Sequence, residues 1–124
     1  MSAILVIDDE KGITRIIEEV LTKTGHKVEI AANGMEGIQK FDNGRFDMVI
    51  TDMRMPGIDG EGVLQHIRRS ERQTTPIIGI SGTPWLLKEA DFDMILSKPF
   101  PLKELVDSVK NLVHVSSPPA TATA

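Results

Sequence analysis

The stretch LVIDDEKG, residues 5–12, places two adjacent aspartates directly after a short apolar run. The whole run, Ala3 to Ile7, contains only Ala, Ile, Leu and Val, a composition typical of a strand that is buried on both faces of a sheet. Neighbouring carboxylates at the end of a buried strand repel each other unless a cation joins them. The stretch therefore predicts a strand that carries Asp8 and Asp9 to one edge of a sheet.

The rest of the chain repeats this order of strand and helix four more times. Apolar residues recur at helical spacing from Ile13 to Leu21, and Gly25 is expected to end that helix. Further strands are expected at residues 27–31, 46–51, 77–80 and 93–96, and further helices at residues 34–43, 61–69, 84–90 and 101–113, with Pro101 as the first residue of the last helix. The alternation predicts an α/β fold, a doubly wound five-stranded parallel sheet in the order 2-1-3-4-5 with five helices, the fourth of them short.

Length and composition suit one folded domain. The chain has 124 residues, of which 40% are hydrophobic and 26% are charged. We expect the domain at residues 1–115 and a disordered tail, or the start of a linker, at residues 116–124, which contain only Ser, Pro, Ala and Thr. No apolar run is long enough to span a membrane and no signal peptide precedes the first strand, so a cytoplasmic location is expected.

The side-chain inventory excludes several kinds of site. The chain has no cysteine, which excludes disulfides, zinc–thiolate sites and thiol catalysis. The net charge of −4 comes without a long run of either sign, which argues against binding to nucleic acid. We interpret the cluster of Arg68, Arg69 and Arg72 as the solvated end of a helix.

Polar side chains stand at the carboxyl ends of four of the five expected strands. They are Asp8 and Asp9 after the first strand, Asp52 after the third, Ser81 after the fourth and Lys98 after the fifth. Each of them alone is most simply a turn former or a solvated side chain. Because ligand sites in such sheets lie at the carboxyl ends of the strands, we expect all five to converge at one edge.

The chemistry of this set fits phosphoryl transfer. Carboxylate oxygens suit Mg²⁺, which takes one or two protein carboxylates and would leave a third free to act as a nucleophile. Lys98 would neutralise charge on phosphoryl oxygens, and the Ser81 hydroxyl could donate a hydrogen bond to one of them. Rival motifs are missing: there is no P-loop and no G-x-G-x-x-G, and the loop Asp-Asp-Glu-Lys lacks the hydroxyl groups that an FMN phosphate would need. The histidines, His26, His66 and His114, are expected at exposed positions far from this edge.

Four segments together resemble the receiver domain of bacterial two-component response regulators: ILVIDDE, DMVITDMRMPGIDG, IIGISG and ILSKPF. The resemblance extends from Ala3 to about Val115 and implies a flavodoxin-like fold. It implies that Asp52 accepts a phosphoryl group from a sensor histidine kinase or a histidine phosphotransfer protein. The phosphorylated domain would switch binding to a downstream protein that the sequence does not name, and would be a monomer or weak dimer.

The resemblance also implies a role for each residue of the site. It assigns four ligands to Mg²⁺: Asp8, Asp9, Asp52 and the backbone carbonyl of Arg54. Ser81 would turn toward the phosphoryl group and Lys98 would contact it. The Lys98-Pro99 peptide bond would be cis. Such a domain would catalyse its own phosphorylation and slow dephosphorylation without being a conventional turnover enzyme.

Two features depart from the family pattern. The family has Tyr or Phe three residues before the lysine, as a switch residue, whereas this chain has Ile95. The segment between Ser81 and Lys98 is shorter than in the family, and the missing part falls on the expected fourth helix. Trp85 in that segment is either an exposed residue that binds a partner or part of the core.

Three functions remain open. The first is a phosphorylatable receiver. The second is a pseudo-receiver whose binding does not depend on phosphorylation; the intact set of site residues argues against it and Ile95 favours it. The third is an aspartyl-phosphate phosphatase, which normally carries a second aspartate two residues past the nucleophile. Arg54 stands at that position, so only slow hydrolysis is expected.

Overall fold

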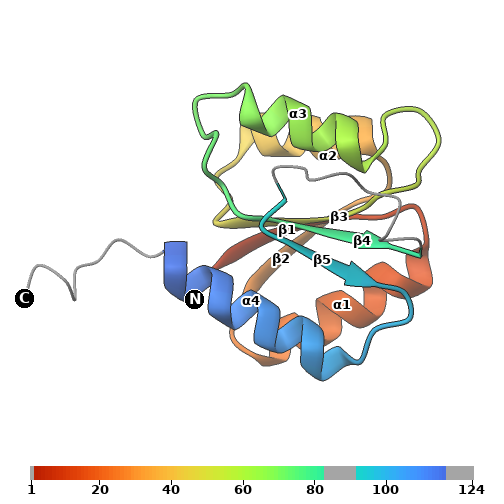
Figure 1. The fold of residues 1–124 in the computed structure, drawn as a ribbon, viewed down its shortest axis with the longest axis vertical. Helices are drawn as coiled ribbons and strands as arrows, with labels where there is room; N and C mark the ends of the chain where they lie inside the picture. The colour runs from red at the N-terminus through yellow and green to blue at the C-terminus, as the bar shows by residue number, and fades with distance from the viewer. Residues whose placement is uncertain (1, 83–91, 117–124) are drawn as a thin grey trace, which may run out of the picture.

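Five parallel strands form one sheet, and helices cover both of its faces (Figure 1). The computed structural model describes residues 2–82 and 92–116. The strands are β1 (Ala3–Ile7), β2 (Lys27–Ala31), β3 (Met48–Asp52), β4 (Ile77–Ser81) and β5 (Met94–Ser97), and the described helices are α1 (Lys11–Lys23), α2 (Gly34–Asn43), α3 (Gly60–Arg68) and α4 (Leu102–Ser116). The strand order is β2-β1-β3-β4-β5, which confirms the predicted fold class and topology.

The alternation of side chains along each strand divides the core into two layers. On one face of the sheet, Ile4 and Val6 of β1 pack in a cluster with residues of α1 and α4. On the other face, Leu5 and Ile7 pack in a cluster with residues of α2 and α3. All four side chains are at most 1% exposed. A strand buried on both faces requires an unbroken apolar run, which is what the sequence of β1 supplies.

Local signals end and begin the helices where the sequence predicts them. Gly25 ends α1 with a φ of 93°, a conformation that favours glycine. Its N–H donates to the carbonyl of Thr22, and the N–H of His26 donates to the carbonyl of Leu21, both at 3.1 Å, which is the Schellman pattern of a helix end. At the start of α2, the side chain of Asn33 accepts a hydrogen bond from a backbone N–H of the first turn.

The element bounds differ from the prediction by up to three residues, the largest difference being at the end of α4, which reaches Ser116 rather than residue 113. β3 begins at Met48 rather than at residue 46, and β5 covers Met94–Ser97 rather than residues 93–96. Pro101 precedes the last helix rather than starting it: α4 begins at Leu102, and the Pro101 carbonyl accepts the first hydrogen bonds of the helix. The short helix expected at residues 84–90, including Trp85, and the expected tail from residue 117 onward lie outside the described residues.

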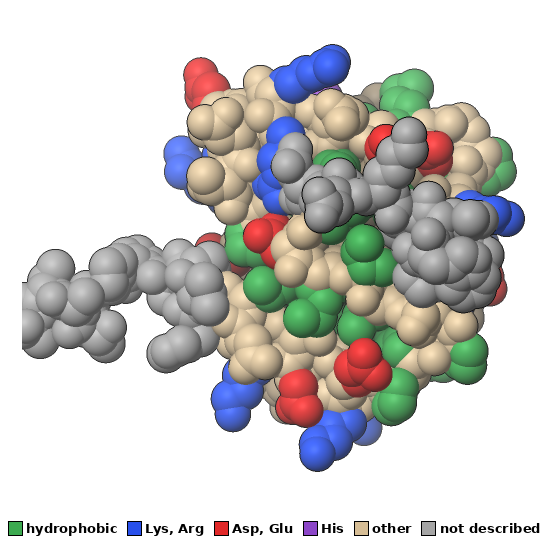
Figure 2. All heavy atoms as spheres, viewed as in Figure 1, with side chains coloured by type: hydrophobic (Ala, Val, Ile, Leu, Met, Phe, Trp, Pro, Cys, Tyr) green, Lys and Arg blue, Asp and Glu red, His purple; other side chains and the backbone are tan. Residues whose placement is uncertain are grey.

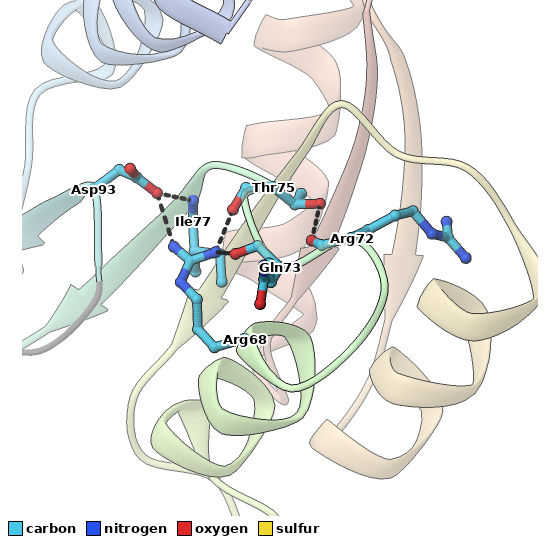
Figure 3. A network of polar contacts seen from close by, with 6 residues as sticks. All are labelled: Arg68, Arg72, Gln73, Thr75, Ile77 and Asp93. Atoms are coloured by element: carbon cyan, nitrogen blue, oxygen red, sulfur yellow. Dashed lines mark hydrogen bonds and ion pairs between the residues drawn. The ribbon is translucent and has the colours of Figure 1, made fainter.

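The end of α3 is tied to the segments that lead into β4 and β5 by a half-buried arginine network (Figure 3). Nη1 of Arg68 donates to the carbonyls of Gln73 and Thr75 at 2.8 and 2.7 Å. Its Nη2 pairs with Oδ2 of Asp93 at 3.0 Å, and that same carboxylate oxygen accepts a hydrogen bond from the N–H of Ile77 at 2.8 Å. The side chain of Arg68 is only 17% exposed. The prediction that it forms part of a solvated helix end is therefore wrong.

Arg72 also departs from that prediction. Its guanidinium donates to the carbonyl of Gly44 and lies 4.9 Å from the centroid of the Phe41 ring. Such a position over an aromatic face is a cation–π contact. Of the three clustered arginines, Arg69 is exposed as predicted.

The surface carries mixed charge. On the face shown in Figure 2, Lys and Arg side chains are interspersed with Asp and Glu side chains, and hydrophobic side chains gather near the centre. Among residues 2–82 and 92–116, no helix combines the length and the apolar character needed to cross a bilayer.

Candidate functional site

Three carboxylates converge at the carboxyl ends of β1 and β3. These strands are hydrogen-bonded neighbours in which Ile7 lies opposite Thr51, so the residues that follow, Asp8 and Asp52, emerge side by side. One carboxylate oxygen from each of Asp8, Asp9 and Asp52 lies within 4.8 Å of the other two. The structure therefore brings together the acidic residues that the sequence pattern places at this edge.

Asp8 is the more buried member of the adjacent pair. It is 2% exposed, whereas Asp9 is exposed. Oδ1 of Asp8 accepts a hydrogen bond from the N–H of Glu10 at 2.9 Å, and Oδ2 is buried with no hydrogen-bond partner among the described residues. Burial raises the pKa of Asp8 to about 6; the Glu10 N–H opposes this rise, and the negative charge of Asp52 adds to it. A buried carboxylate oxygen without a partner is the kind of group that a bound cation satisfies.

Lys98 provides a positive charge beside Asp52. Its Nζ lies 3.1 Å from Oδ1 of Asp52, and the two side chains are 23% and 5% exposed. Burial raises the pKa of Asp52, although contact with Lys98 opposes the rise. Burial on its own lowers the pKa of Lys98, but the contact with Asp52 outweighs burial and the net change is upward. The ammonium thus stays protonated next to a carboxylate that is held in a poorly solvated place.

Backbone hydrogen bonds fix the neighbouring strand ends. Ser81 is buried at the end of β4, and its carbonyl accepts a hydrogen bond from the N–H of Lys98 at 2.8 Å. The N–H of Met53 donates to the carbonyl of Ile80 at 3.0 Å. These bonds hold the end of β3, the end of β4 and Lys98 at one edge of the sheet. The Lys98-Pro99 peptide bond is cis, as the resemblance implies.

The side chains of two predicted residues, Arg54 and Ile95, do not join the buried charged side chains of the site. Arg54 is exposed in the loop that follows β3, so its guanidinium does not take part in the buried ion pair. Ile95 lies half-buried in the middle of β5, opposite Gly79 of β4. Its aliphatic side chain brings no polar group to the site.

Glu10 is a member of the site that sequence reasoning did not single out. Its Oε1 lies 3.2 Å from Nζ of Lys98, across 88 residues of sequence. The only signal in the sequence is that an acidic residue follows Asp8 and Asp9 directly. Which cation such a long side chain reaches depends on the fold, so the sequence could not identify the contact.

The described histidines lie away from the carboxylates, as predicted, but they are not fully exposed. His26 lies between α1 and the amino end of β2 and is half-buried. His66 of α3 is also half-buried, and its Nε2 lies 2.8 Å from Oδ1 of Asp42 on α2. The side chain of His114 lies outside the described residues.

The residues of the site fit a hard divalent cation. The cluster offers only oxygen donors, and Oδ2 of Asp8 lacks a hydrogen-bond partner among the described residues. Mg²⁺ takes this kind of ligand and usually keeps several waters in its coordination shell. The exposure of Asp9 leaves one side of the cluster open to solvent.

An apolar groove opens beside Lys98, between the start of α1 and the loop that joins β5 to α4. It has a volume of about 470 Å³ and is lined by Ile13, Ile16, Ile17, Lys98, Pro99, Phe100 and Leu102. Two of these side chains are unusually exposed for their type: Ile16 is 48% and Leu102 is 41% exposed. The groove therefore offers an apolar contact surface next to the ion pair.

Comparisons with known proteins agree with this geometry. The family model described as "Response regulator receiver domain" matches residues 4–110. The transcriptional regulatory protein TcrA of Mycobacterium tuberculosis is 33% identical over 114 residues, which are 88% of this chain and 45% of TcrA. The transcriptional regulatory protein ResD of Bacillus subtilis is 35% identical over 119 residues, which are 92% of this chain and 49% of ResD. The chain thus spans about half the length of the curated relatives it matches.

A solved structure with the same fold is that of the response regulator protein TrrA from Thermotoga maritima in complex with Mg²⁺ and BeF. It superposes with a TM-score of 0.82 at 36% sequence identity, covering 90% of this chain and 99% of TrrA. The family match covers most of the chain, and the fold agrees with that of the solved structure. The chain belongs to the family of response regulator receiver domains of two-component signalling.

Proposed function

We propose that this receiver domain accepts a phosphoryl group on Asp52 in a Mg²⁺-dependent reaction and thereby switches binding to another protein. The observation that carries the proposal is the buried Asp52 carboxylate, which is paired with Lys98 and shares a cluster with Asp8 and Asp9. A nucleophile, a cation and two further carboxylates at one sheet edge are the groups that phosphoryl transfer to an aspartate needs.

In the proposed transfer, one carboxylate oxygen of Asp52 forms a bond to phosphorus. The bond between phosphorus and a histidine nitrogen of the donor breaks at the same time, and its electron pair stays on that nitrogen, which takes up a proton. Lys98 balances negative charge on the phosphoryl oxygens because its ammonium already lies 3.1 Å from Asp52. Asp8, Asp9, Asp52 and the backbone carbonyl of Arg54 would hold Mg²⁺, which when bound supplies positive charge that offsets the repulsion between carboxylates and phosphoryl oxygens.

Hydrolysis reverses the modification. A water oxygen forms a bond to phosphorus, the bond from phosphorus to Asp52 breaks, and inorganic phosphate leaves with the carboxylate restored. A phosphatase would place a second carboxylate near this water as a general base. The side chain two residues past Asp52 is the exposed Arg54, which offers no such base, so slow autodephosphorylation is expected.

The switch follows from added charge. A phosphoryl group adds roughly −1.5 to −2 charge at neutral pH. The Ser81 hydroxyl would turn toward it, and the hydrogen bond between the Ser81 carbonyl and the Lys98 N–H couples β4 to the end of β5. A displacement there would shift a two-state surface. Because Ile95 is aliphatic, this displacement would pass through the strands rather than through an aromatic side chain at that position.

The phosphoryl donor is proposed to be a cytoplasmic sensor histidine kinase or a histidine phosphotransfer protein. Receiver domains of response regulators interact with histidine kinases as a class. The groove beside Lys98 gives such a donor an apolar surface, including Ile16 and Leu102, that adjoins the reacting groups. We also propose that the phosphorylated domain binds a downstream protein and that the domain is a monomer or weak dimer.

Intact-mass measurement after incubation with Mg²⁺ and acetyl phosphate tests the proposal. We expect the mass of one added phosphoryl group in the wild-type chain and no addition in Asp52→Ala. Failure of the wild type to gain mass with donor and metal both present would favour the pseudo-receiver. Rapid turnover of acetyl phosphate over many cycles would favour the phosphatase.

A further inference from the structure

The contact between Glu10 and Lys98 has no role in the transfer described above. Oε1 of Glu10 lies 3.2 Å from Nζ of Lys98, and the same Nζ lies 3.1 Å from Oδ1 of Asp52. One ammonium therefore bridges a buried carboxylate and a second carboxylate at the rim of the site. The side chain of Glu10 is 60% exposed, so its charge faces solvent at the rim of the site.

The backbone of Glu10 is held independently of its side chain. Glu10 is the residue that precedes α1, and its N–H donates to Oδ1 of Asp8 at 2.9 Å. Its carbonyl accepts hydrogen bonds from the N–H groups of Ile13 and Thr14, both at 3.1 Å. Its side chain makes no capping hydrogen bond to the helix and pairs with Lys98 instead. A change confined to the carboxylate would leave the start of α1 and the position of Asp8 in place.

Phosphorylation changes what Lys98 faces. The phosphoryl group brings roughly −1.5 to −2 charge and three acceptor oxygens to Asp52. These oxygens and the Glu10 carboxylate would then compete for the same ammonium, and they would repel each other as like charges. From this geometry we infer that Glu10 is a positioning residue, which holds Lys98 in the unphosphorylated domain and opposes the phosphorylated state. The inference rests on the proposed function of Asp52.

The exposure of the Glu10 side chain sets the expected size of its effect on the phosphorylated state. Ion pairs with an exposed partner contribute little to free energy, so removal of the Glu10 charge should change the equilibrium by about two- to fivefold. The effect should weaken as salt is added, because salt screens charges that face solvent. A role of Glu10 in local structure alone would lack this dependence on salt.

Beryllofluoride binding measures this equilibrium without chemistry, because BeF₃⁻ attaches to a carboxylate in the shape of a phosphoryl group. We would titrate it in the presence of Mg²⁺ and follow bound fluoride by ¹⁹F NMR, at low and at high salt. Glu10→Gln should bind about two- to fivefold more tightly than the wild type at low salt, with a smaller ratio at high salt. Glu19→Gln is the matched control. Glu19 is also exposed and lies in α1, and removal of its carboxylate changes the net charge by the same amount.

The outcomes separate the inference from the function on which it rests. Equal affinity of Glu10→Gln and the wild type would overturn the inference, and so would an equal gain in Glu19→Gln or a gain that does not depend on salt. In each of these cases the wild type still binds beryllofluoride, and the proposed function stands. If the wild type binds no beryllofluoride with Mg²⁺ present, the proposed function itself fails.

Discussion

At the scale of single residues, we expect His26 to make the stability of the fold depend on pH. It is half-buried, and its Nδ1 is buried with no hydrogen-bond partner among the described residues. Burial lowers the pKa of His26 below its usual value of about 6.5. The folded chain therefore binds this proton less readily than the unfolded chain. The stability associated with neutral His26 is present above about pH 6.5 and is lost as the pH falls through the range below it.

His26→Gln tests this assignment, because glutamine does not titrate. In the wild type, the contribution of neutral His26 to the urea midpoint should decrease as the pH is lowered from about 7.5 to about 5.5. The difference in midpoint between variant and wild type should therefore shift in favour of the variant as the pH is lowered. A difference that stays constant across this range would show that His26 titrates alike in the folded and unfolded chains.

The residues of the site differ in how far the sequence could identify them. Asp8, Asp9 and Asp52 could be predicted because a strand end is a local signal and parallel strands bring their carboxyl ends to one edge. The contacts of Glu10 and Arg68 could not be predicted. Glu10 reaches Lys98, which lies far away in sequence, and Arg68 donates to a backbone carbonyl. A long charged side chain carries no local signal of its partner.

At the scale of elements, the start of α3 lies against the end of β3. A Cβ at Gly60 would lie 2.5 Å from the carbonyl oxygen of Asp52, and 2.9 Å from both Cα and Sδ of Met53. Two of these atoms belong to the backbone and cannot rotate away. The absence of a side chain at Gly60 thus lets the helix begin directly beside the strand that carries Asp52.

Gly60→Ala should therefore destabilise the domain by about 1–3 kcal/mol, the range found when a packed region is overfilled. Urea denaturation measures the change. Gly12→Ala is the matched control: a Cβ at Gly12 of α1 meets no atom within 4 Å, so that variant should lose no stability. Equal stabilities of Gly60→Ala and the wild type would mean that α3 can move away from β3 without loss.

The exposed apolar surface of α1 gives a second prediction at this scale. Ile16→Ser should slow phosphorylation by a protein donor, a histidine kinase or phosphotransfer protein that phosphorylates the wild type, because it removes apolar contact area from the groove beside Lys98. Phosphorylation by acetyl phosphate should not change. Met35→Ser is the control, since Met35 of α2 is 57% exposed and does not line this groove. If Ile16→Ser and Met35→Ser slow transfer equally, the groove has no special part in donor recognition.

At the scale of the whole molecule, Mg²⁺ binding should be linked to stability. The cation would relieve repulsion among Asp8, Asp9 and Asp52 in the folded chain only, so excess Mg²⁺ should raise the thermal midpoint relative to EDTA. Asp8→Asn removes one charge while keeping an acceptor for the Glu10 N–H. We expect this variant to gain much less from Mg²⁺ than the wild type. An equal gain in both proteins would place the metal elsewhere.

The overall fold could be predicted from sequence because its signals are local and repeated. Apolar runs mark the strands, and Gly25 ends α1 through its own backbone conformation. The exact ends of elements could not be predicted, because they depend on which hydrogen bonds neighbouring segments complete. Pro101 illustrates this: its carbonyl accepts from the first turn of α4, yet the helix begins at the next residue.

In the proposed function, Asp52 is the residue modified, while Asp8 and Asp9 hold the metal. Reduction with borohydride converts an aspartyl phosphate to homoserine, so it marks the acceptor permanently. After incubation with acetyl phosphate and Mg²⁺, reduction and peptide fragmentation, we expect homoserine at position 52 alone. Homoserine at position 8 or 9, or at no position in a chain that has gained phosphoryl mass, would show that Asp52 is not the phosphoryl acceptor.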